Sequence, residues 1–97
     1  MPKSAFSANA QAKVVAAAVA KLLGGGKPDE PKLINTCYSL VAPDYGISVA
    51  NVYAPADGQI KDLGGGVSPA NAPASARLLE ATFANGWFKT IAAEVFG

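Results

Sequence analysis

The sequence predicts an α+β fold with an N-terminal helix, a three-stranded antiparallel meander and C-terminal helices. Three observations lead to this class. Apolar residues recur at three- and four-residue spacing near both ends of the chain, as expected of helices. Runs of strand-forming residues occupy the middle of the chain. Two short turn sequences separate these runs and indicate hairpins.

The first helix is expected over about residues 7–23, with Ser7 or Asn9 as its N-cap. Alanine, the strongest helix former, fills much of this segment. The glycines at 24–26 are expected to end the helix, because glycine accepts the left-handed conformation found after a helix C-terminus. Residues 27–31 contain two prolines and indicate an extended linker.

Strands are expected over residues 33–42 and 47–54, joined by the turn sequence of residues 43–46. A second turn, Asp57-Gly58, leads into a short strand over residues 59–63. Residues 64–73 are expected to form a flexible loop, because this segment contains three glycines and two prolines.

The C-terminal segment carries large apolar residues at helical spacing, which indicates either one long helix or two helices joined at Asn85-Gly86. Hydrophobic residues make up 51% of the chain and charged residues only 15%. A small domain of this composition is expected to expose an apolar face that a partner surface would cover. Self-association through the apolar helical tail is therefore one expectation.

Composition also excludes several classes of function. The eight Lys and Arg residues are scattered and the net charge is +1, so nucleic acid is not an expected partner. No apolar run is long enough to span a bilayer. The chain has no His, which removes the central member of a Ser-His-Asp triad and of the usual zinc sites, and no metal site is expected. A complete enzyme is hard to build from the remaining residues.

Cys37 is the one residue with redox potential, and as the single cysteine it cannot form an intrachain disulfide. Strand alternation places it on one face with Asn35 and Ser39, in the more polar middle of its strand. The alternative is a buried cysteine that acts as a small hydrophobic residue, as unpaired cysteines often do. Trp87 has two interpretations as well: it packs in the core, or its ring stacks near a planar cofactor.

The entry to the first helix, residues 2–7, is a further candidate site. Backbone N–H groups and the positive end of the helix dipole favour negative charge at such a position. Almost every helix has such an end, and Lys3 is as well explained as a solvated side chain.

Three blocks of the sequence, residues 1–13, 35–49 and 86–97, resemble the flavoprotein subunit of flavocytochrome c sulfide dehydrogenase, in the FAD/NAD-linked reductase superfamily. The resemblance implies that residues 1–26 are the terminal helix of an FAD-binding domain. Residues 27–97 are then a C-terminal domain of the sulfide dehydrogenase type, similar to the C-terminal dimerisation domains of related reductases. The two dinucleotide-binding-type domains that form the bulk of the subunit would lie upstream.

The resemblance also assigns residues. Cys37 matches the redox-active cysteine of the family, whose disulfide partner lies far upstream. Lys3, Ser4, Ala5 and Phe6 match the last segment that contacts FAD, although relatives often carry Gly in place of Ala5 and Tyr in place of Phe6. Trp87 matches an aromatic position near the flavin.

The implied reaction is the oxidation of sulfide, with electrons passing through FAD to haem on a cytochrome c subunit in the periplasm. The expected partners are the upstream FAD-binding domains and the cytochrome c subunit, and the isolated chain is expected to be inactive. Two alternatives stay open. One is a free-standing interaction or dimerisation module without catalytic activity. The other is a fragment of a sulfide:quinone reductase, for which a more amphipathic, membrane-binding tail is expected.

Overall fold

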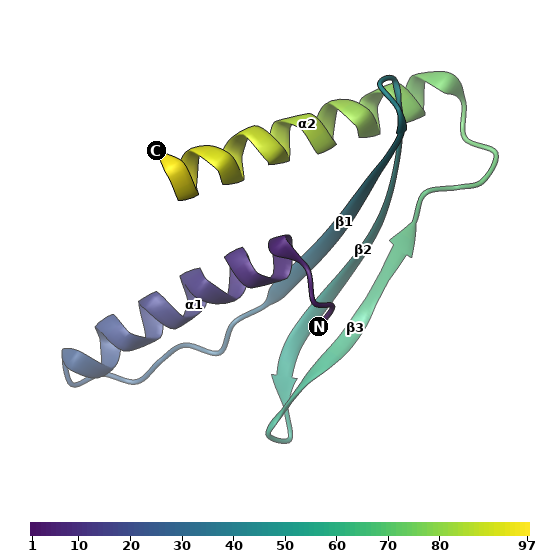
Figure 1. Ribbon diagram of the computed structural model, residues 1–97. Coiled ribbons are helices and arrows are strands. Elements are labelled where there is room, and N and C mark those ends of the chain that lie inside the picture. The colour runs from purple at the N-terminus through teal and green to yellow at the C-terminus, as the bar shows by residue number, and fades with distance from the viewer. The chain divides into compact units, whose positions relative to one another are not determined.

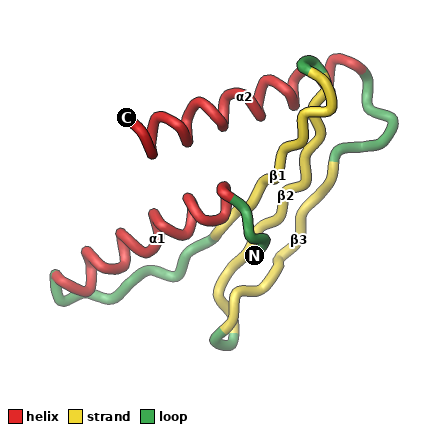
Figure 2. The backbone as a smooth tube through the Cα atoms, in the orientation of Figure 1, coloured by secondary structure: helices red, strands yellow, loops and turns green.

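The computed structural model describes residues 1–97. Its elements, in chain order, are α1 (Ala5–Leu23), β1 (Leu33–Ala42), β2 (Tyr45–Ala56), β3 (Gln59–Val67) and α2 (Ala74–Phe96) (Figure 1). The strands form one sheet in the order β1-β2-β3, so each strand pairs with its neighbour in the sequence (Figure 2). The predicted α+β class and the three-stranded meander are confirmed.

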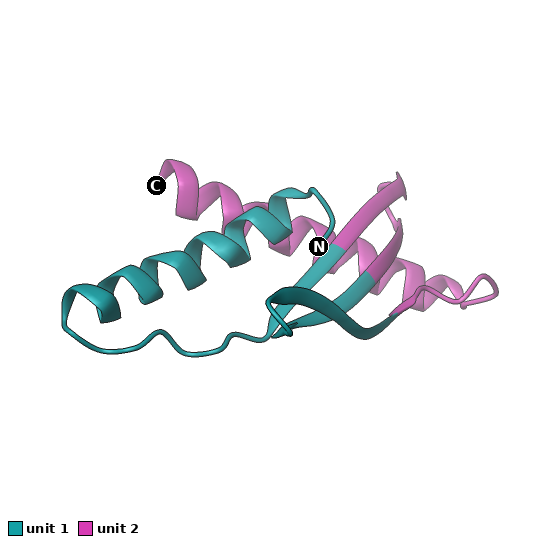
Figure 3. Ribbon diagram, turned by 90° about the horizontal axis from the view of Figure 1, so that it is seen from below, with its two compact units in different colours: residues 1–36, 50–65 teal, residues 37–49, 66–97 magenta.

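The chain divides into two compact units (Figure 3). Unit 1 comprises residues 1–36 and 50–65 and contains α1, and unit 2 comprises residues 37–49 and 66–97 and contains α2. Each strand contributes residues to both units. The candidate site residues therefore fall into two groups, with Lys3, Ser4, Ala5 and Phe6 in unit 1 and Cys37 and Trp87 in unit 2.

In unit 1, α1 begins earlier than the apolar spacing indicates. Its N-cap is Ser4, whose Oγ accepts a hydrogen bond from the Ser7 amide at 3.1 Å. The prediction that Ser7 or Asn9 is the N-cap was wrong, because apolar periodicity locates the middle of a helix better than its first turn. The end of α1 is confirmed at the glycines: Gly24 is the C-cap, and Gly25 has a φ of 82°.

Both predicted turns are confirmed. Pro43 and Asp44 are the two residues between β1 and β2. Asp57 and Gly58, between β2 and β3, have φ values of 52° and 73°. Positive φ at both central residues is the requirement of the type I′ turn, which matches the twist of the strands that it joins.

The third strand is longer than predicted. A loop was expected from residue 64, but β3 continues through all three glycines to Val67. A Cβ at Gly65 would lie 1.9 Å from the carbonyl oxygen of Ala50, so β2 and β3 approach there more closely than any side chain allows. Here glycine permits strand pairing, whereas its usual effect in a sequence pattern is to indicate a loop.

In unit 2, α2 is one continuous helix through Asn85 and Gly86, so the suggested joint at this pair does not exist. The helix lies close to β2 because the contact is made of small residues. Ala81 is 2% exposed, and a Cβ added at Gly46 would lie 2.4 Å from the Ala81 backbone nitrogen. Backbones can approach this closely only where glycine and alanine meet.

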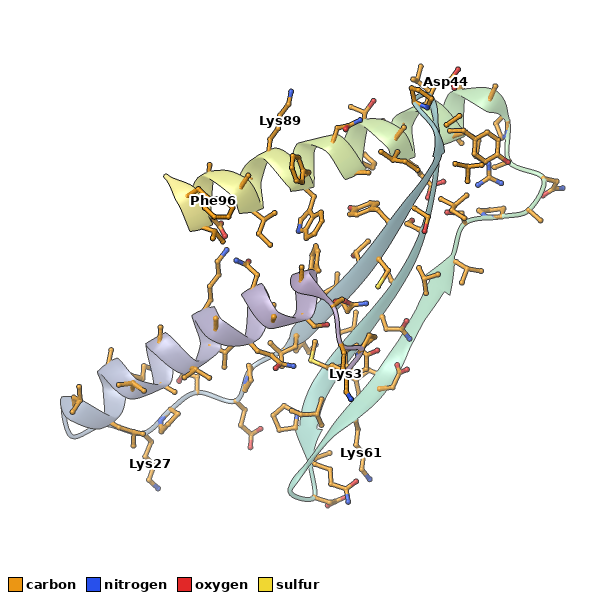
Figure 4. All side chains as sticks on the ribbon, in the orientation of Figure 1. Lys3, Lys27, Asp44, Lys61, Lys89 and Phe96 are labelled. Atoms are coloured by element: carbon orange, nitrogen blue, oxygen red, sulfur yellow. The ribbon has the colours of Figure 1, made fainter.

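Few apolar side chains are buried. The buried hydrophobic residues are Leu33, Tyr53, Ala81 and Ala84, whereas Leu23 at the end of α1 is 85% exposed and Phe96 at the end of α2 is 87% exposed. Figure 4 labels Phe96 at the C-terminal end of its helix. This exposure confirms the apolar surface expected from the composition. Neither helix combines the length and the hydropathy that a membrane crossing requires.

Candidate functional site

Cys37 lies on β1 in unit 2 and is exposed. The interpretation of Cys37 as a buried core residue therefore does not hold. The thiol borders a hollow of about 330 Å³ that is formed within unit 2. Besides Cys37 and Arg77, the residues around this hollow are Ser39, Tyr45, Ile47, Ser48, Val49, Val67, Ser68 and Ala70. The cysteine is thus accessible to small reagents and ligands.

Trp87 also belongs to unit 2, on α2. Its ring is partly buried, and its centroid lies 6.3 Å from that of the Tyr38 ring, with the two planes inclined by 35°. Tilted aromatic pairs at this separation contribute to packing. Tyr38 follows Cys37 on β1, and strand alternation directs their side chains to opposite faces of the sheet.

The residues matched to the FAD-contacting segment lie together at the start of α1, in unit 1. Lys3 and Ala5 are exposed, and Phe6 is partly buried. The first turn contains no acidic residue, so no carboxylate offsets the positive end of the helix dipole. A second hollow, of about 470 Å³, adjoins this turn and is lined by Met1, Pro2, Lys3, Ser4, Ala5, Ser7, Ala8 and Gln11. This end of α1 is suited to an anionic or electron-rich group.

Asn35 fixes this first turn in place. Its side-chain oxygen accepts hydrogen bonds from Ser4 Oγ at 2.6 Å and from Ser7 Oγ at 2.8 Å, and Asn35 is only 1% exposed. Ser7 is 2% exposed. Sequence reasoning assigned no role to Asn35, although a buried Asn within a strand is a signal, since Asn is depleted in strands.

A polar cluster at the start of α2 was not predicted either. Glu80 Oε1 accepts hydrogen bonds from Ser68 Oγ at 2.5 Å and from Ser48 Oγ at 2.7 Å. These two hydrogen bonds, that from Ser68 above all, hold the pKa of Glu80 below its ordinary value; burial opposes the effect and the Arg77 charge adds to it. Ser68 Oγ also accepts the Ser48 amide at 2.7 Å, so the cluster joins β2, the chain after β3 and α2.

Arg77 completes the cluster and is 4% exposed. Its Nη2 donates to the carbonyl oxygen of Pro69, and its guanidinium lies 5.1 Å from the centroid of the Tyr45 ring. Nη1 is 3.5 Å from Glu80 Oε2, an ion pair, yet neither Nη1 nor Nε makes a hydrogen bond. From the sequence, Arg77 was only one of several scattered cations, because its burial depends on residues from separate segments.

Comparison with known families adds one finding to this geometry. The family model described as "Flavocytochrome c sulphide dehydrogenase, flavin-binding" matches residues 29–96, more than two thirds of the chain. The chain belongs to this family. The resemblance inferred from the sequence is thereby confirmed. The family is one of flavin-binding domains, and its name links them to a flavocytochrome c.

The matched region contains Cys37, Trp87 and the cluster of Ser48, Ser68, Arg77 and Glu80. Asn35 is also within it, whereas Lys3, Ser4, Ala5 and Phe6 precede it. Through the hydrogen bonds of Ser4 and Ser7 to Asn35, the start of α1 is joined to a residue of the matched region.

Proposed function

We propose that the chain is the C-terminal part of the flavoprotein subunit of an FAD-dependent sulfide dehydrogenase, with Cys37 as its redox-active cysteine. The observation that carries the proposal is an exposed thiol at an open hollow, within a region that the flavin-binding family model matches. In this proposal, residues 1–26 are the terminal helix of the FAD-binding domain and residues 27–97 the C-terminal domain. Electrons pass to a cytochrome c subunit, and the complete protein is periplasmic.

The first turn of α1 fits one edge of a flavin, and we assign Lys3, Ser4, Ala5 and Phe6 to it. The hydroxyl groups of Ser4 and Ser7 both donate to Asn35, so their hydrogens are engaged and the turn is held in a fixed position. The amide of Ala5, the first helical residue, has no carbonyl oxygen four residues earlier within the helix to which it could donate. It is available as a donor to the electron-rich pyrimidine edge. We assign the Trp87 ring to the same cofactor.

Bound FAD would take up the electrons that leave sulfide. The part of this chain is the thiol chemistry. In the oxidised protein, Cys37 forms a disulfide with a cysteine of the upstream chain. The sulfur of hydrosulfide forms a bond to one cysteine sulfur, the bond between the two cysteines breaks, and the other cysteine leaves as a thiolate. A single cysteine cannot complete this step, so the chain alone is inactive.

The test begins with the DNA upstream of the Met1 codon. A continuous reading frame that encodes a G-x-G-x-x-G domain and further cysteines is expected. The longer protein should then bind flavin and reduce cytochrome c with sulfide, and the 97-residue chain should be colourless and inactive. A stop codon and a ribosome-binding site before Met1, or stoichiometric flavin in the short chain, would contradict the proposal.

Variants of the longer protein test the cysteine itself. Cys37→Ser should abolish the reduction of cytochrome c and leave flavin bound. Ser39→Ala is the matched control, because Ser39 borders the same hollow and has no redox chemistry. Full activity in Cys37→Ser would contradict the role assigned to the thiol.

A second candidate function is a self-associating module without catalysis. The observation that favours it is the exposure of large apolar side chains along α2, which is unusual for a helix face that contacts only solvent. These side chains are Leu78, Leu79, Phe83, Phe88, Val95 and Phe96, each more than half exposed. Sedimentation equilibrium of the purified chain tests it, and a monomer at high concentration would exclude it.

A further inference from the structure

We propose that Asn35 is a positioning residue for the flavin: it holds the first turn of α1 in place and keeps that end of the helix free of negative charge. The proposal rests on the proposed function, because it takes the flavin edge to lie at this turn. It goes further in naming a residue, only 1% exposed, that sets the reduction potential of the flavin through the turn that it holds. Three observations carry it: the hydrogen bonds of Asn35, the free amide of the turn, and the charges around the turn.

Asn35 takes both hydroxyl hydrogens of the turn. Ser4 Oγ and Ser7 Oγ donate to the same oxygen of Asn35, at 2.6 and 2.8 Å, across 31 and 28 residues of sequence. Ser4 Oγ also accepts the Ser7 amide at 3.1 Å, so the N-cap itself belongs to this arrangement. A hydroxyl group has a single hydrogen to donate. Ser4 and Ser7 therefore fix the turn to Asn35 and have no hydroxyl hydrogen left for a ligand.

The contact with a ligand is left to the backbone of the turn. The Ser7 amide is taken by Ser4 Oγ, and the Ala8 amide donates to the carbonyl oxygen of Ser4 at 2.9 Å. The Ala5 amide is the first of the helix, and first amides point out of the helix end. Because Asn35 holds the turn, this donor keeps one position, and a donor already in place needs no ordering when the ligand binds.

Asn35 accepts its hydrogen bonds without adding a charge, although a carboxylate in its place could accept both hydroxyl groups as well. The first turn of α1 contains no acidic residue, and Lys3 (labelled in Figure 4) is the one charged side chain beside the hollow at this turn. No carboxylate there offsets the positive end of the helix dipole. Negative charge develops at the pyrimidine edge of a flavin on reduction, so these surroundings raise its reduction potential.

Two variants of the longer protein separate the two roles of Asn35. Asn35→Ala removes the acceptor and frees the turn, so the visible circular dichroism of the bound flavin, which depends on fixed surroundings, should weaken. Asn35→Asp keeps the acceptor and should restore this signal, but its added charge should make the flavin harder to reduce. We expect the equilibrium constant of two-electron reduction to fall about tenfold, which lowers the midpoint potential by about 30 mV.

Gln59→Glu is the matched control. It makes the same change from amide to carboxylate in unit 1, at an exposed position that does not border the hollow, and should keep the midpoint potential of the wild type. The 97-residue chain gives a readout without flavin. In urea, its Asn35→Asp variant should unfold closer to the wild-type midpoint than its Asn35→Ala variant, because only the carboxylate still accepts from Ser4 and Ser7.

An Asn35→Asp variant that binds flavin and keeps the wild-type midpoint potential would overturn the inference and leave the proposed function intact. An equal shift in Gln59→Glu would also overturn it, by indicating an effect of net charge alone. A longer protein that binds no flavin would overturn the proposed function, and this inference with it. If Asn35→Asp does not fold, the dichroism of Asn35→Ala decides: a flavin signal equal to that of the wild type would contradict the positioning role.

Discussion

Replacing Gly46 with alanine tests the close approach between β2 and α2. The added Cβ would lie 2.4 Å from the nitrogen of Ala81, 2.7 Å from the carbonyl carbon of Glu80 and 2.9 Å from the Cα of Ala81. All three are backbone atoms, so no change of rotamer relieves the overlap, and the strand or the helix must move. Overpacking of this kind costs about 1–3 kcal/mol. Because rigid backbone is involved, we expect the free energy of unfolding to fall by about 2–3 kcal/mol.

Urea unfolding followed by circular dichroism measures this loss, as a lower midpoint at an unchanged m-value. Gly66→Ala is the matched control, because it makes the same change in the same unit at a position with no atom within 4 Å of the added Cβ. We expect this control to stay within about 0.5 kcal/mol of the wild type. Equal free energies of unfolding for Gly46→Ala and Gly66→Ala would contradict the close approach of α2 to β2 at Gly46.

Three further predictions use the same unfolding assay. Asn35→Ala should lower the free energy of unfolding by about 1–3 kcal/mol, because the buried hydroxyl of Ser7 loses its acceptor; an unchanged midpoint would argue against this role. The pKa of Glu80 is lowered in the folded chain, so its stabilisation is present above the ordinary pKa of glutamate and is lost as the pH falls through the folded value. Wild type should therefore lose more stability in acid than Glu80→Gln. If the free energies of unfolding of the two proteins fell equally as the pH was lowered, this prediction would be wrong. Gly86→Ala should raise the free energy of unfolding by up to about 1 kcal/mol, since α2 is continuous there and has room for a Cβ; a loss would indicate a broken helix.

The parts of the fold that were predicted correctly are those encoded by neighbouring residues. Asp57-Gly58 specifies its turn through its own dihedral preferences, and the glycines after Leu23 end α1 in the same way. The parts that were missed depend on contacts between distant segments. The glycines of β3 indicate a loop until the approach of Gly65 to Ala50 is known.

The same distinction applies to the candidate site. Alternation did not decide the exposure of Cys37, because Asn35 lies on the same face of β1 and is only 1% exposed. The cluster around Glu80 could not be predicted, because its hydrogen bonds span 12 residues to Ser68 and 32 residues to Ser48. Arg77 likewise contacts Pro69 and Tyr45, which lie in separate segments of the chain. The flavin-contacting roles of residues 3–6 and of Trp87 stay predictions.

Two elements indicate that the chain works with part of its surface covered. All nine residues of β3 are exposed, so this strand buries no face of its own. The buried residues of α2 are Arg77, Ala81 and Ala84, a narrow stripe, while its large apolar side chains remain exposed. A helix with apolar residues on several faces is normally enclosed on more than one side. The upstream domains and the cytochrome subunit of the proposed parent would supply such cover.

In that case, the longer protein should protect α2 from proteolysis at Phe83 and Phe88, while the 97-residue chain is cleaved there. Equal cleavage of α2 in the two proteins would show that the upstream domains do not cover this helix. Self-association would then remain as the explanation of its exposed apolar side chains.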